Sequence, residues 1–387
     1  MKGKALNVLI LKRSGTCLAW VIRHCMKAFG QLGHSSTVLD LDQVKEEVVL
    51  RERILRLRPN LVLANNHMGL NSQLCEELKI PHACWLEEDP FYWVRKKDVS
   101  PYRILFVYDK AYIPRLKGMG FKEIHFLPLS TDPEHFKEVS LSEEEIRRYG
   151  CELSFAGGSY YKSFEIIEDL LGKWGEPKIR MISDETIRFQ SNNLSLHIWD
   201  VMETFQHKYK YPIPFADEEG AIMFGRLLAG AATSLYRGRL INSLNEFDFH
   251  LYGDEGWKNL LRDGRIKFYG SLPYEELPRL FTASKINLNL TTTPIKTSLT
   301  QRPFDVLACG GFVLSDYRQD IQSLLEIDKE IVYFRAEEEL KEKIDYFLKH
   351  PRERREIAKR GQRRVLGEHT YKYRMERLVR VMREIFG

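Results

Sequence analysis

Residues 301–316 read QRPFDVLACGGFVLSD. The pattern predicts a short helix over Gln301–Ala308, then a tight turn at Gly310 and Gly311, which need no room for a side chain. The apolar run that follows, Gly311–Leu314, is typical of a buried strand. A helix that turns directly into a continuous apolar strand favours an α/β fold, in which helices cover both faces of a parallel sheet.

The same alternation of helix and strand signals runs through the first 140 residues. Helical stretches such as Leu18–Gln31 and Gln43–Arg56 lie between apolar runs that are bounded by polar turns. With right-handed crossovers, this order predicts a Rossmann-like, doubly wound domain over residues 1–140. Its expected strands are Ala5–Leu11, Thr37–Leu41, Asn60–Ala64, His82–Leu86, Arg103–Tyr108 and Glu123–Pro128.

A polar segment, 129–149, carries Pro133 and a helix-capping signal at Ser142, and we interpret it as the linker to a second domain. That domain is expected over residues 150–370, with helices Glu218–Leu244, Pro273–Ser284 and Gln301–Ala308. Its expected strands are Glu152–Ala156, Phe247–Tyr252, Ile266–Tyr269, Ile286–Leu290, Gly311–Leu314 and Ile331–Phe334. The sequence therefore predicts two Rossmann-like domains in tandem.

Two segments fall outside this simple plan. Residues 175–214 hold the strand-like pieces Ile179–Ile182 and Leu196–Trp199 and are a candidate insertion. The tail is helical, and its last helix, 371–387, is a candidate to cross back to the first domain. In open α/β sheets ligands bind beyond the carboxyl ends of the strands, so two such domains predict a cleft between those ends.

Composition narrows the function classes. The 387 residues carry 59 Lys and Arg and 54 Asp and Glu, a net charge of +5. This surplus fits an anionic ligand, or at most peripheral contact with an acidic membrane, because no apolar run of about 18 residues could span one. The basic run 352–364 (RERREIAKRGQRR) is interleaved with acids and favours a solvated amphipathic helix over nucleic-acid binding.

The N-terminus and the cysteines favour a cytoplasmic location. The first apolar run ends at Lys12 and Arg13 and lacks the small-residue cleavage site of a signal peptide. Six cysteines are scattered without a C-x-x-C pair, which argues against a disulfide scaffold and a zinc module.

Six motifs stand out along the chain. They are PHACWLEEDP (81–90), IHFLPLSTDPEHF (124–136), ELSFAGGSYYKS (152–163), HLYGDEGWKN (250–259), KFYGSLPYEELPRLFTASKINLNL (267–290) and QRPFDVLACGGFVLSD (301–316). Together they resemble GT-B glycosyltransferases of the CgeB-like group (spore maturation protein type), which carry a Glyco_trans_1_2 C-terminal domain. The resemblance implies a C-terminal donor domain for a nucleotide-diphosphate sugar, with a UDP-sugar favoured, and an N-terminal acceptor domain.

The donor site is expected where strands of the second domain end. Arg302 can make a charge-assisted bond to a diphosphate, and Asp305 can accept from ribose hydroxyls. Retaining relatives often carry a second acid eight positions earlier, where this chain has Thr297, so inverting and retaining outcomes both stay open. The complete set of candidate donor-binding residues is Gly157, Gly158, Lys162, Gly253, Gly270, Ser271, Leu272, Arg302, Asp305 and Gly310.

The acceptor side is expected after strands of the first domain. The loop Ser14, Gly15 and Thr16 follows the first strand and lacks the dinucleotide fingerprint G-x-G-x-x-G, which disfavours an oxidoreductase. Three acids, Glu87, Glu88 and Asp89, follow the fourth strand beside Trp85 and suit hydroxyl binding and base catalysis. The candidate catalytic residues are Asp89, which the family resemblance favours, Glu88, His67 and Arg302.

The expected protein is thus a glycosyltransferase that needs no metal and no cofactor besides its sugar-nucleotide co-substrate. Lys162 and Arg302 can balance phosphate charge, and Asp40 and Asp42 end a strand where Rossmann-like units commonly carry acids. The acceptor stays open between a protein, a lipid-linked glycan and a polysaccharide. The alternative is a non-catalytic protein that binds nucleotide sugars or assembles a surface or spore structure.

Overall fold

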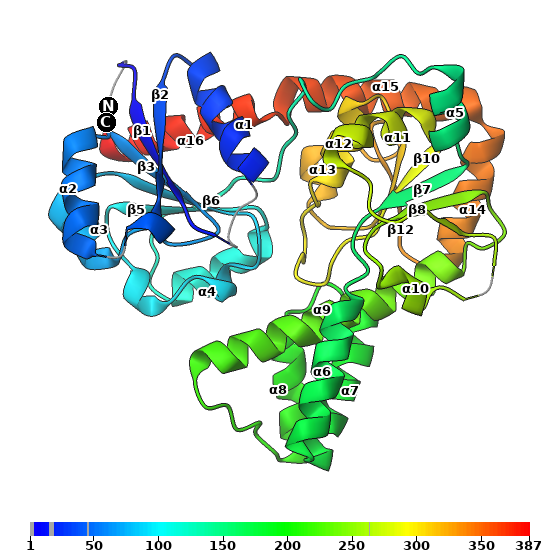
Figure 1. The fold of residues 1–387 in the computed structure, drawn as a ribbon, viewed down its shortest axis with the longest axis horizontal. Helices are drawn as coiled ribbons and strands as arrows, with labels where there is room; N and C mark the ends of the chain where they lie inside the picture. The colour runs from blue at the N-terminus through cyan, green and yellow to red at the C-terminus, as the bar shows by residue number, and fades with distance from the viewer. Residues whose placement is uncertain (1–3, 15–18, 45, 263) are drawn as a thin grey trace. The chain divides into compact units, whose positions relative to one another are not determined.

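The computed structural model describes residues 4–14, 19–44, 46–262 and 264–387. The chain divides into two compact units, one formed by Met1–Asp132 together with Gly367–Gly387 and the other by Pro133–Leu366 (Figure 1). Each unit is built around a parallel six-stranded sheet, as the sequence predicts.

The first unit has the strand order β2-β1-β3-β4-β5-β6. Every residue of the three strands β3, β4 and β5 is buried, which explains their continuous apolar sequences. The strands are β1 (Asn7–Lys12), β2 (Ser35–Asp40), β3 (Leu61–Asn65), β4 (His82–Leu86), β5 (Arg103–Val107) and β6 (Ile124–Phe126). The helices are α1 (Ala19–Gln31), α2 (Glu47–Leu57), α3 (Ser72–Leu78) and α4 (Ile113–Gly118), with α16 (Tyr371–Phe386) from the C-terminus.

The C-terminal helix α16 is part of the core of the first unit, beside its sheet in Figure 1. Met375 and Leu378 are fully buried in the same apolar cluster as Val8 and Phe29. The buried guanidinium of Arg374 donates to the backbone oxygens of Pro128, at 2.7 Å, and Leu129, at 3.0 Å. Residues 367–387 therefore fold with a sheet that lies more than 240 positions earlier in the chain.

The second unit has the strand order β12-β11-β10-β7-β8-β9. Its strands are β7 (Leu153–Ala156), β8 (Phe249–Tyr252), β9 (Lys267–Phe268), β10 (Ile286–Asn289), β11 (Val313–Asp316) and β12 (Val332–Phe334). Its helices are α5 (Glu143–Tyr149), α6 (Tyr161–Trp174), α7 (Pro177–Asn192), α8 (Ile198–Tyr209), α9 (Glu218–Asn242), α10 (Trp257–Leu260), α11 (Leu277–Ala283), α12 (Arg302–Ala308), α13 (Ile321–Leu324), α14 (Glu337–Lys349) and α15 (Pro351–Glu368). Both strand orders occur in Rossmann-like domains. The first sheet begins 2-1-3-4-5, and the second, counted from β7 as its first strand, reads 6-5-4-1-2-3.

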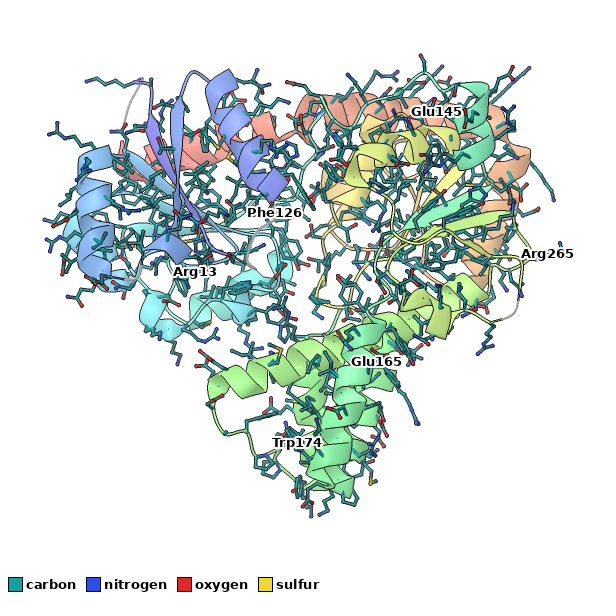
Figure 2. The ribbon with its side chains drawn as sticks, viewed as in Figure 1. Arg13, Phe126, Glu145, Glu165, Trp174 and Arg265 are labelled. Carbon is teal, nitrogen blue, oxygen red and sulfur yellow. The ribbon has the colours of Figure 1, made fainter. Side chains whose placement is uncertain are left out.

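The prediction of strand-like pieces within 175–214 is wrong. The first piece lies in α7, and the second runs from the preceding turn into the start of α8; both helices project with α6 and α9 away from the sheet of this unit (Figure 1). Ile179 and Ile182 are three positions apart and face a separate apolar core, a helical period that short apolar pieces do not reveal on their own. Trp174, labelled in Figure 2, ends α6 and stacks on Phe224 of α9 at 5.3 Å between ring centroids.

The contact of α6 with α9 depends on a missing side chain at Gly230. A Cβ at this position would lie 2.6 Å from the Cβ of Ser163 on α6. We expect Gly230→Ala to lower the free energy of unfolding by about 1 kcal/mol, because overpacking of about 1–3 kcal/mol exceeds a helix-propensity gain of about 1 kcal/mol. Urea unfolding followed by circular dichroism measures the change.

The matched control is Gly172→Ala on the exposed side of α6. A Cβ there meets no atom within 4 Å, so only the propensity term remains and stability should rise by about 0.5–1 kcal/mol. Equal effects at the two glycines would contradict close packing of α6 on α9.

Candidate functional site

Three glycine-containing loops meet at the carboxyl ends of β7, β8 and β9. The backbone N–H of Gly253 donates to the oxygen of Gly270 at 2.9 Å, and the Trp257 indole donates to the oxygen of Gly157 at 2.8 Å. Ser159 donates its backbone N–H to Asp254 at 2.7 Å. The sequence-predicted residues Gly157, Gly158, Gly253, Gly270 and Ser271 therefore lie at one edge of the second sheet.

Gly157 is required by a close approach of Arg302. A Cβ at Gly157 would lie 2.6 Å from a guanidinium nitrogen of Arg302 and 2.9 Å from the ring of Phe155. Arg302 begins α12, and its guanidinium lies 4.9 Å from the centroid of that same ring. The loop after β7 and the start of α12 are thus in direct contact.

A second arginine, Arg237 of α9, completes this cluster. Its guanidinium is buried, lies 5.2 Å from the Phe155 centroid and donates to the oxygens of Gly158 and Leu290, each at 2.6 Å. Arg302 donates to the side-chain oxygen of Asn289 at 3.3 Å. Within the described ranges neither arginine forms an ion pair with a carboxylate.

The two guanidinium groups are electrostatically strained. Burial lowers the pKa of Arg302 to about 9, and the neighbouring charge of Arg237 lowers it further in the same direction. Burial also lowers the pKa of Arg237. These two cations share an aromatic ring and have only backbone and amide acceptors, which makes them candidates to bind an anion at the end of β7.

Asp305 lies one turn beyond Arg302, buried, with Gln301 donating to its carboxylate at 3.3 Å. The helix α12 itself has only seven residues. Leu272 is half-buried in the turn after β9, next to Ser271, whose hydroxyl donates to the oxygen of Gly253 at 3.2 Å.

Two predicted donor residues do not join this cluster. Lys162 is 80% exposed and pairs with Glu165 at 3.2 Å on the surface of α6. Gly310 follows the far end of α12 with φ +72°, where a Cβ would meet Gln362 and Glu138. Gly310 therefore ends the helix in the left-handed conformation that favours glycine, and its contact with the donor stays a prediction.

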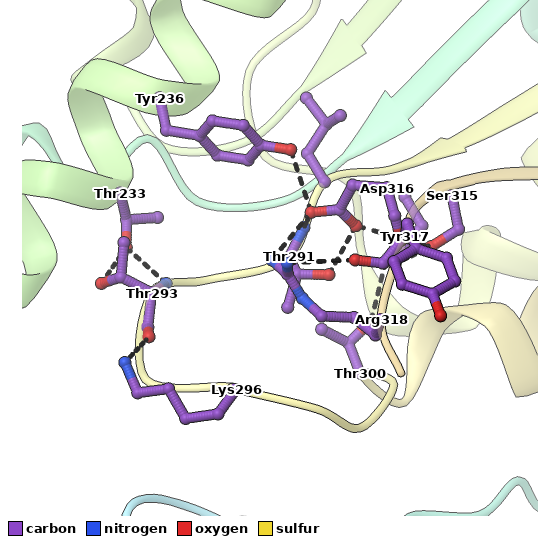
Figure 3. Close-up of polar contacts among 12 residues, drawn as sticks. Thr233, Tyr236, Thr291, Thr293, Lys296, Thr300, Ser315, Asp316, Tyr317 and Arg318 are labelled. Atoms are coloured by element: carbon purple, nitrogen blue, oxygen red, sulfur yellow. Dashed lines mark hydrogen bonds and ion pairs between the residues drawn. The ribbon is translucent and has the colours of Figure 1, made fainter. Parts of the chain in front are cut away.

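A buried carboxylate, Asp316 at the end of β11, fixes the loop that leads to α12 (Figure 3). It accepts from the Tyr236 hydroxyl at 2.9 Å, the Thr291 N–H at 3.0 Å, the Thr291 hydroxyl at 2.6 Å and Arg318 at 3.0 Å. Further along the loop, Thr293 bonds to Thr233 of α9 at 3.0 Å. Because this loop ends where Arg302 begins α12, Asp316 acts on the site through the backbone.

The acids after β4 differ in their surroundings. Asp89 is buried and accepts from the N–H of Phe91 at 3.0 Å, capping the short helix Pro90–Tyr92. The backbone N–H groups of Glu87 and Glu88 both donate to the side-chain oxygen of Asn66, at 2.6 and 3.0 Å. This arrangement gives Asp89 a structural task and leaves the two glutamates beside each other at the strand end.

The carboxyl of Glu87 has a shifted pKa. Burial raises its pKa to about 8; the charge of Glu88 acts in the same direction and a hydrogen bond from Asn65 opposes it. A carboxyl that titrates near neutral pH can give or take a proton during a reaction. The sequence placed Glu87 in this group but favoured Asp89 or Glu88 as the base.

The surroundings of His67 do not favour it as the base. Its Nε2 contacts the backbone oxygen of Leu11 at 3.1 Å, and its Nδ1 accepts from the N–H of Gly69 at 2.9 Å. Burial lowers its pKa to about 4, so the ring is neutral and both nitrogens are used by the backbone. These contacts give His67 a structural role, and its role as a base stays a prediction that the geometry does not favour.

The loop after β1 is described only in part. The N–H of Ser14 donates to Asp42 at 2.7 Å, whereas Gly15 and Thr16 lie outside the described residues. Asp40 pairs with Lys12 at 2.8 Å. Both acids of the D-x-D pattern thus have partners within the protein.

Glu87 and His67 give the first unit a predictable pH dependence. The pKa of Glu87 is about 8 in the folded protein and returns to its usual 4.5 on unfolding. Between these pH values the folded state holds an extra proton, so stability falls as pH rises from 4.5 to 8. Unfolding returns His67 from about 4 to 6.5, so stability falls as pH drops from 6.5 to 4.

We expect Glu87→Gln to remove the loss of stability between pH 5 and pH 8. The measurement is the midpoint of thermal unfolding at pH 5, 6.5 and 8, with Glu52→Gln, on the exposed face of α2, as the control. A wild-type loss that Glu87→Gln leaves unchanged would show that Glu87 titrates normally.

Comparisons with known proteins show which proteins this chain is similar to. Residues 237–380 match the family model described as glycosyl transferase-like, a segment that begins at Arg237 and contains Arg302 and Asp305. A curated relative, an uncharacterized protein of Aquifex aeolicus (strain VF5), is 24% identical over 337 residues, 84% of this chain and 81% of its own. The family match supports a glycosyltransferase family for this chain.

Solved structures place the fold. A glycosyltransferase from Rickettsia africae ESF-5 matches with a TM-score of 0.61 at 10% identity, over 98% of both chains. Anabaena HepE (Alr3699), solved in complex with UDP-glucose, matches with a TM-score of 0.55 at 11% identity, over 98% of this chain and 100% of its own. The chain has the GT-B fold of two Rossmann-like domains. Among the described residues, no helix is long and apolar enough to cross a membrane.

Proposed function

We propose that this protein transfers a sugar from a nucleotide-diphosphate sugar to an acceptor hydroxyl or amine. The observation that carries the proposal is the pair of the buried Arg237 and the half-buried Arg302 at the glycine loop of β7, both within the segment that matches the glycosyl transferase-like model. A nucleotide diphosphate brings the negative charge that these two cations lack, and HepE, with the same fold, was solved with UDP-glucose.

The reaction breaks the bond between the anomeric carbon and the β-phosphate oxygen and forms a bond from that carbon to the acceptor. Negative charge develops on the departing diphosphate, so fixed guanidinium groups at that place lower the barrier. Asp305 accepts from the ribose hydroxyls, and the backbone turn Gly270–Leu272 faces the base. Because Arg237 and Arg302 supply the charge, the proposed transfer needs no metal ion.

We assign the acceptor side to the carboxyl ends of β3 and β4 in the first unit. Glu87 takes the proton that the acceptor releases, because its raised pKa of about 8 makes its carboxylate a stronger base than an ordinary glutamate. Glu88, on the next position, is the alternative base. The proton balance is complete: the acceptor loses one proton to the carboxylate as its new glycosidic bond forms.

Three finer assignments belong to the same proposal. The CgeB-like group is supported by the match of its expected C-terminal domain over 237–380. A UDP-sugar is the favoured donor, as for HepE. A cytoplasmic location is supported by the five described cysteines, which are all buried free thiols.

A thermal-shift panel of nucleotide diphosphates and nucleotide sugars, with and without magnesium, tests the donor site. At a free ligand concentration a hundredfold above Kd, binding adds about 2.7 kcal/mol, which raises the unfolding midpoint by a few degrees. We expect one nucleotide to act, independently of magnesium, and Asp305→Ala to abolish its effect. A panel without any shift would contradict the donor site, and binding without turnover over a broad acceptor screen would favour a non-catalytic protein.

A further inference from the structure

The second unit contains another pocket, which the proposed transfer does not use. It has a volume of about 560 Å³ and lies at the ends of β11 and β12, beside α9 and the turn between α7 and α8. In the sheet, β10 separates β11 from β7, the strand whose loop contacts the arginine pair. A cavity of this volume suits a ligand of about the size of one or two sugar rings.

The lining of the pocket is cationic. It includes four basic side chains, Arg239, Lys296, Arg318 and Arg335, but only two acids. One acid, Asp316, already accepts hydrogen bonds from Tyr236, Thr291 and Arg318 (Figure 3). The other, Glu337, lies 3.7 Å from Lys341 on its own helix.

Arg318 is a buried side chain of this pocket that hydrogen bonds hold in place. Its side chain is 6% exposed, and its guanidinium donates to Asp316 at 3.0 Å and to the backbone oxygen of Tyr317 at 3.2 Å. Its buried Nε has no hydrogen-bond partner among the described residues. A buried donor without an acceptor is costly, so this side chain has hydrogen-bonding capacity that the described protein groups do not use.

Arg335 is held at the rim by aromatic rings. Its guanidinium lies 3.9 Å from the ring centroid of Tyr317 and 4.7 Å from that of Tyr333, and one of its nitrogens donates to the Tyr333 hydroxyl at 2.7 Å. Neutral hydrogen-bonding side chains complete the wall. They are Ser191, Asn192, Asn193, Ser195 and Gln319.

We propose that this pocket is a second ligand site, which binds a sugar carrying a phosphate or carboxylate group. The arginines bind the anion, and the serine and amide side chains bind the hydroxyls. The helical insertion, through residues 191–195, forms one wall, so the insertion gives this chain a binding surface that a plain Rossmann-like domain would lack. Because the proposed transfer takes its acceptor at the first unit, the ligand of this pocket is an effector of the transfer, and a probe that is itself glycosylated would overturn this assignment.

Isothermal titration of the full chain tests the site, with glucose 6-phosphate and glucuronate as the two anionic probes and glucose as the neutral one. We expect saturable binding of at least one anionic sugar, at least tenfold tighter than glucose and unchanged by saturating UDP. The probe that binds shows whether the site prefers a phosphate or a carboxylate group. A mass increase of one sugar residue on that probe, with the active donor present, identifies an acceptor, and its absence identifies an effector.

The variants Arg239→Gln and Arg335→Gln, combined, keep the fold because both side chains are exposed. We expect them to weaken the anionic sugar at least tenfold while UDP binding stays unchanged. The matched control is Arg355→Gln on the exposed face of α15, which should change neither. The site is refuted if neither anionic sugar binds saturably, if UDP displaces the sugar, or if the double variant binds it as the wild type does. Because UDP binding is read separately, loss of the donor site would be recognised independently.

Discussion

Arg302→Met is expected to lower kcat by about 10²–10³-fold, the usual cost of removing one fixed donor from a developing oxyanion. Arg302 is a half-buried cation beside a second cation, and it donates a hydrogen bond to the side-chain oxygen of Asn289. Methionine retains most of the side-chain volume and removes the repulsion from Arg237. The variant should therefore be as stable as the wild type or more stable, because the desolvation of a buried charge often costs more free energy than its interactions recover.

Steady-state kinetics with the active donor, together with urea unfolding, measure both effects. Lys162→Met is the control, because Lys162 is exposed and bound to Glu165, so its loss should change kcat less than threefold. If Lys162→Met slowed the reaction as much as Arg302→Met, the charge on the leaving group would be balanced from the start of α6. Loss of activity with loss of folding in Arg302→Met would instead indicate a structural arginine.

The sequence predicts the glycine part of this site because parallel strands all end at one edge of their sheet. Gly157, Gly253 and Gly270 follow strands directly, so the topology brings them together without knowledge of side-chain packing. Arg237 could not be found in this way, because it lies inside the 25-residue helix α9 and reaches Gly158 across 79 positions of sequence. The sequence signal that could have indicated Arg237 is an arginine within the apolar run that α9 buries against the sheet.

The acceptor side shows a different limit of sequence reasoning. Glu87, Glu88 and Asp89 are equivalent in the sequence, and only the backbone separates them. Asn66, with φ +52°, turns its side chain to the N–H groups of both glutamates, whereas Asp89 bonds to its own short helix. His67 is disfavoured as a base for the same reason, since backbone groups occupy both ring nitrogens.

The largest expected effect on stability comes from Asp316→Ala. This substitution removes the acceptor of Tyr236 and Thr291 and leaves Arg318 as a buried cation without its carboxylate, and breaking a buried pair from one side costs about 3–5 kcal/mol. Tyr236→Phe, which removes one donor and leaves the ion pair, should cost only about 1 kcal/mol. Urea unfolding measures both.

The double variant Asp316→Ala/Arg318→Met separates charge from packing. If the cost of Asp316→Ala is mainly the unpaired guanidinium, removing Arg318 as well should recover at least half of the lost stability, as a coupling energy in the double-mutant cycle. If instead the two losses add, the carboxylate acts through Thr291 and the loop before α12. In that case Asp316→Ala should also lower kcat at temperatures where the variant is fully folded, because Arg302 begins the helix that this loop positions.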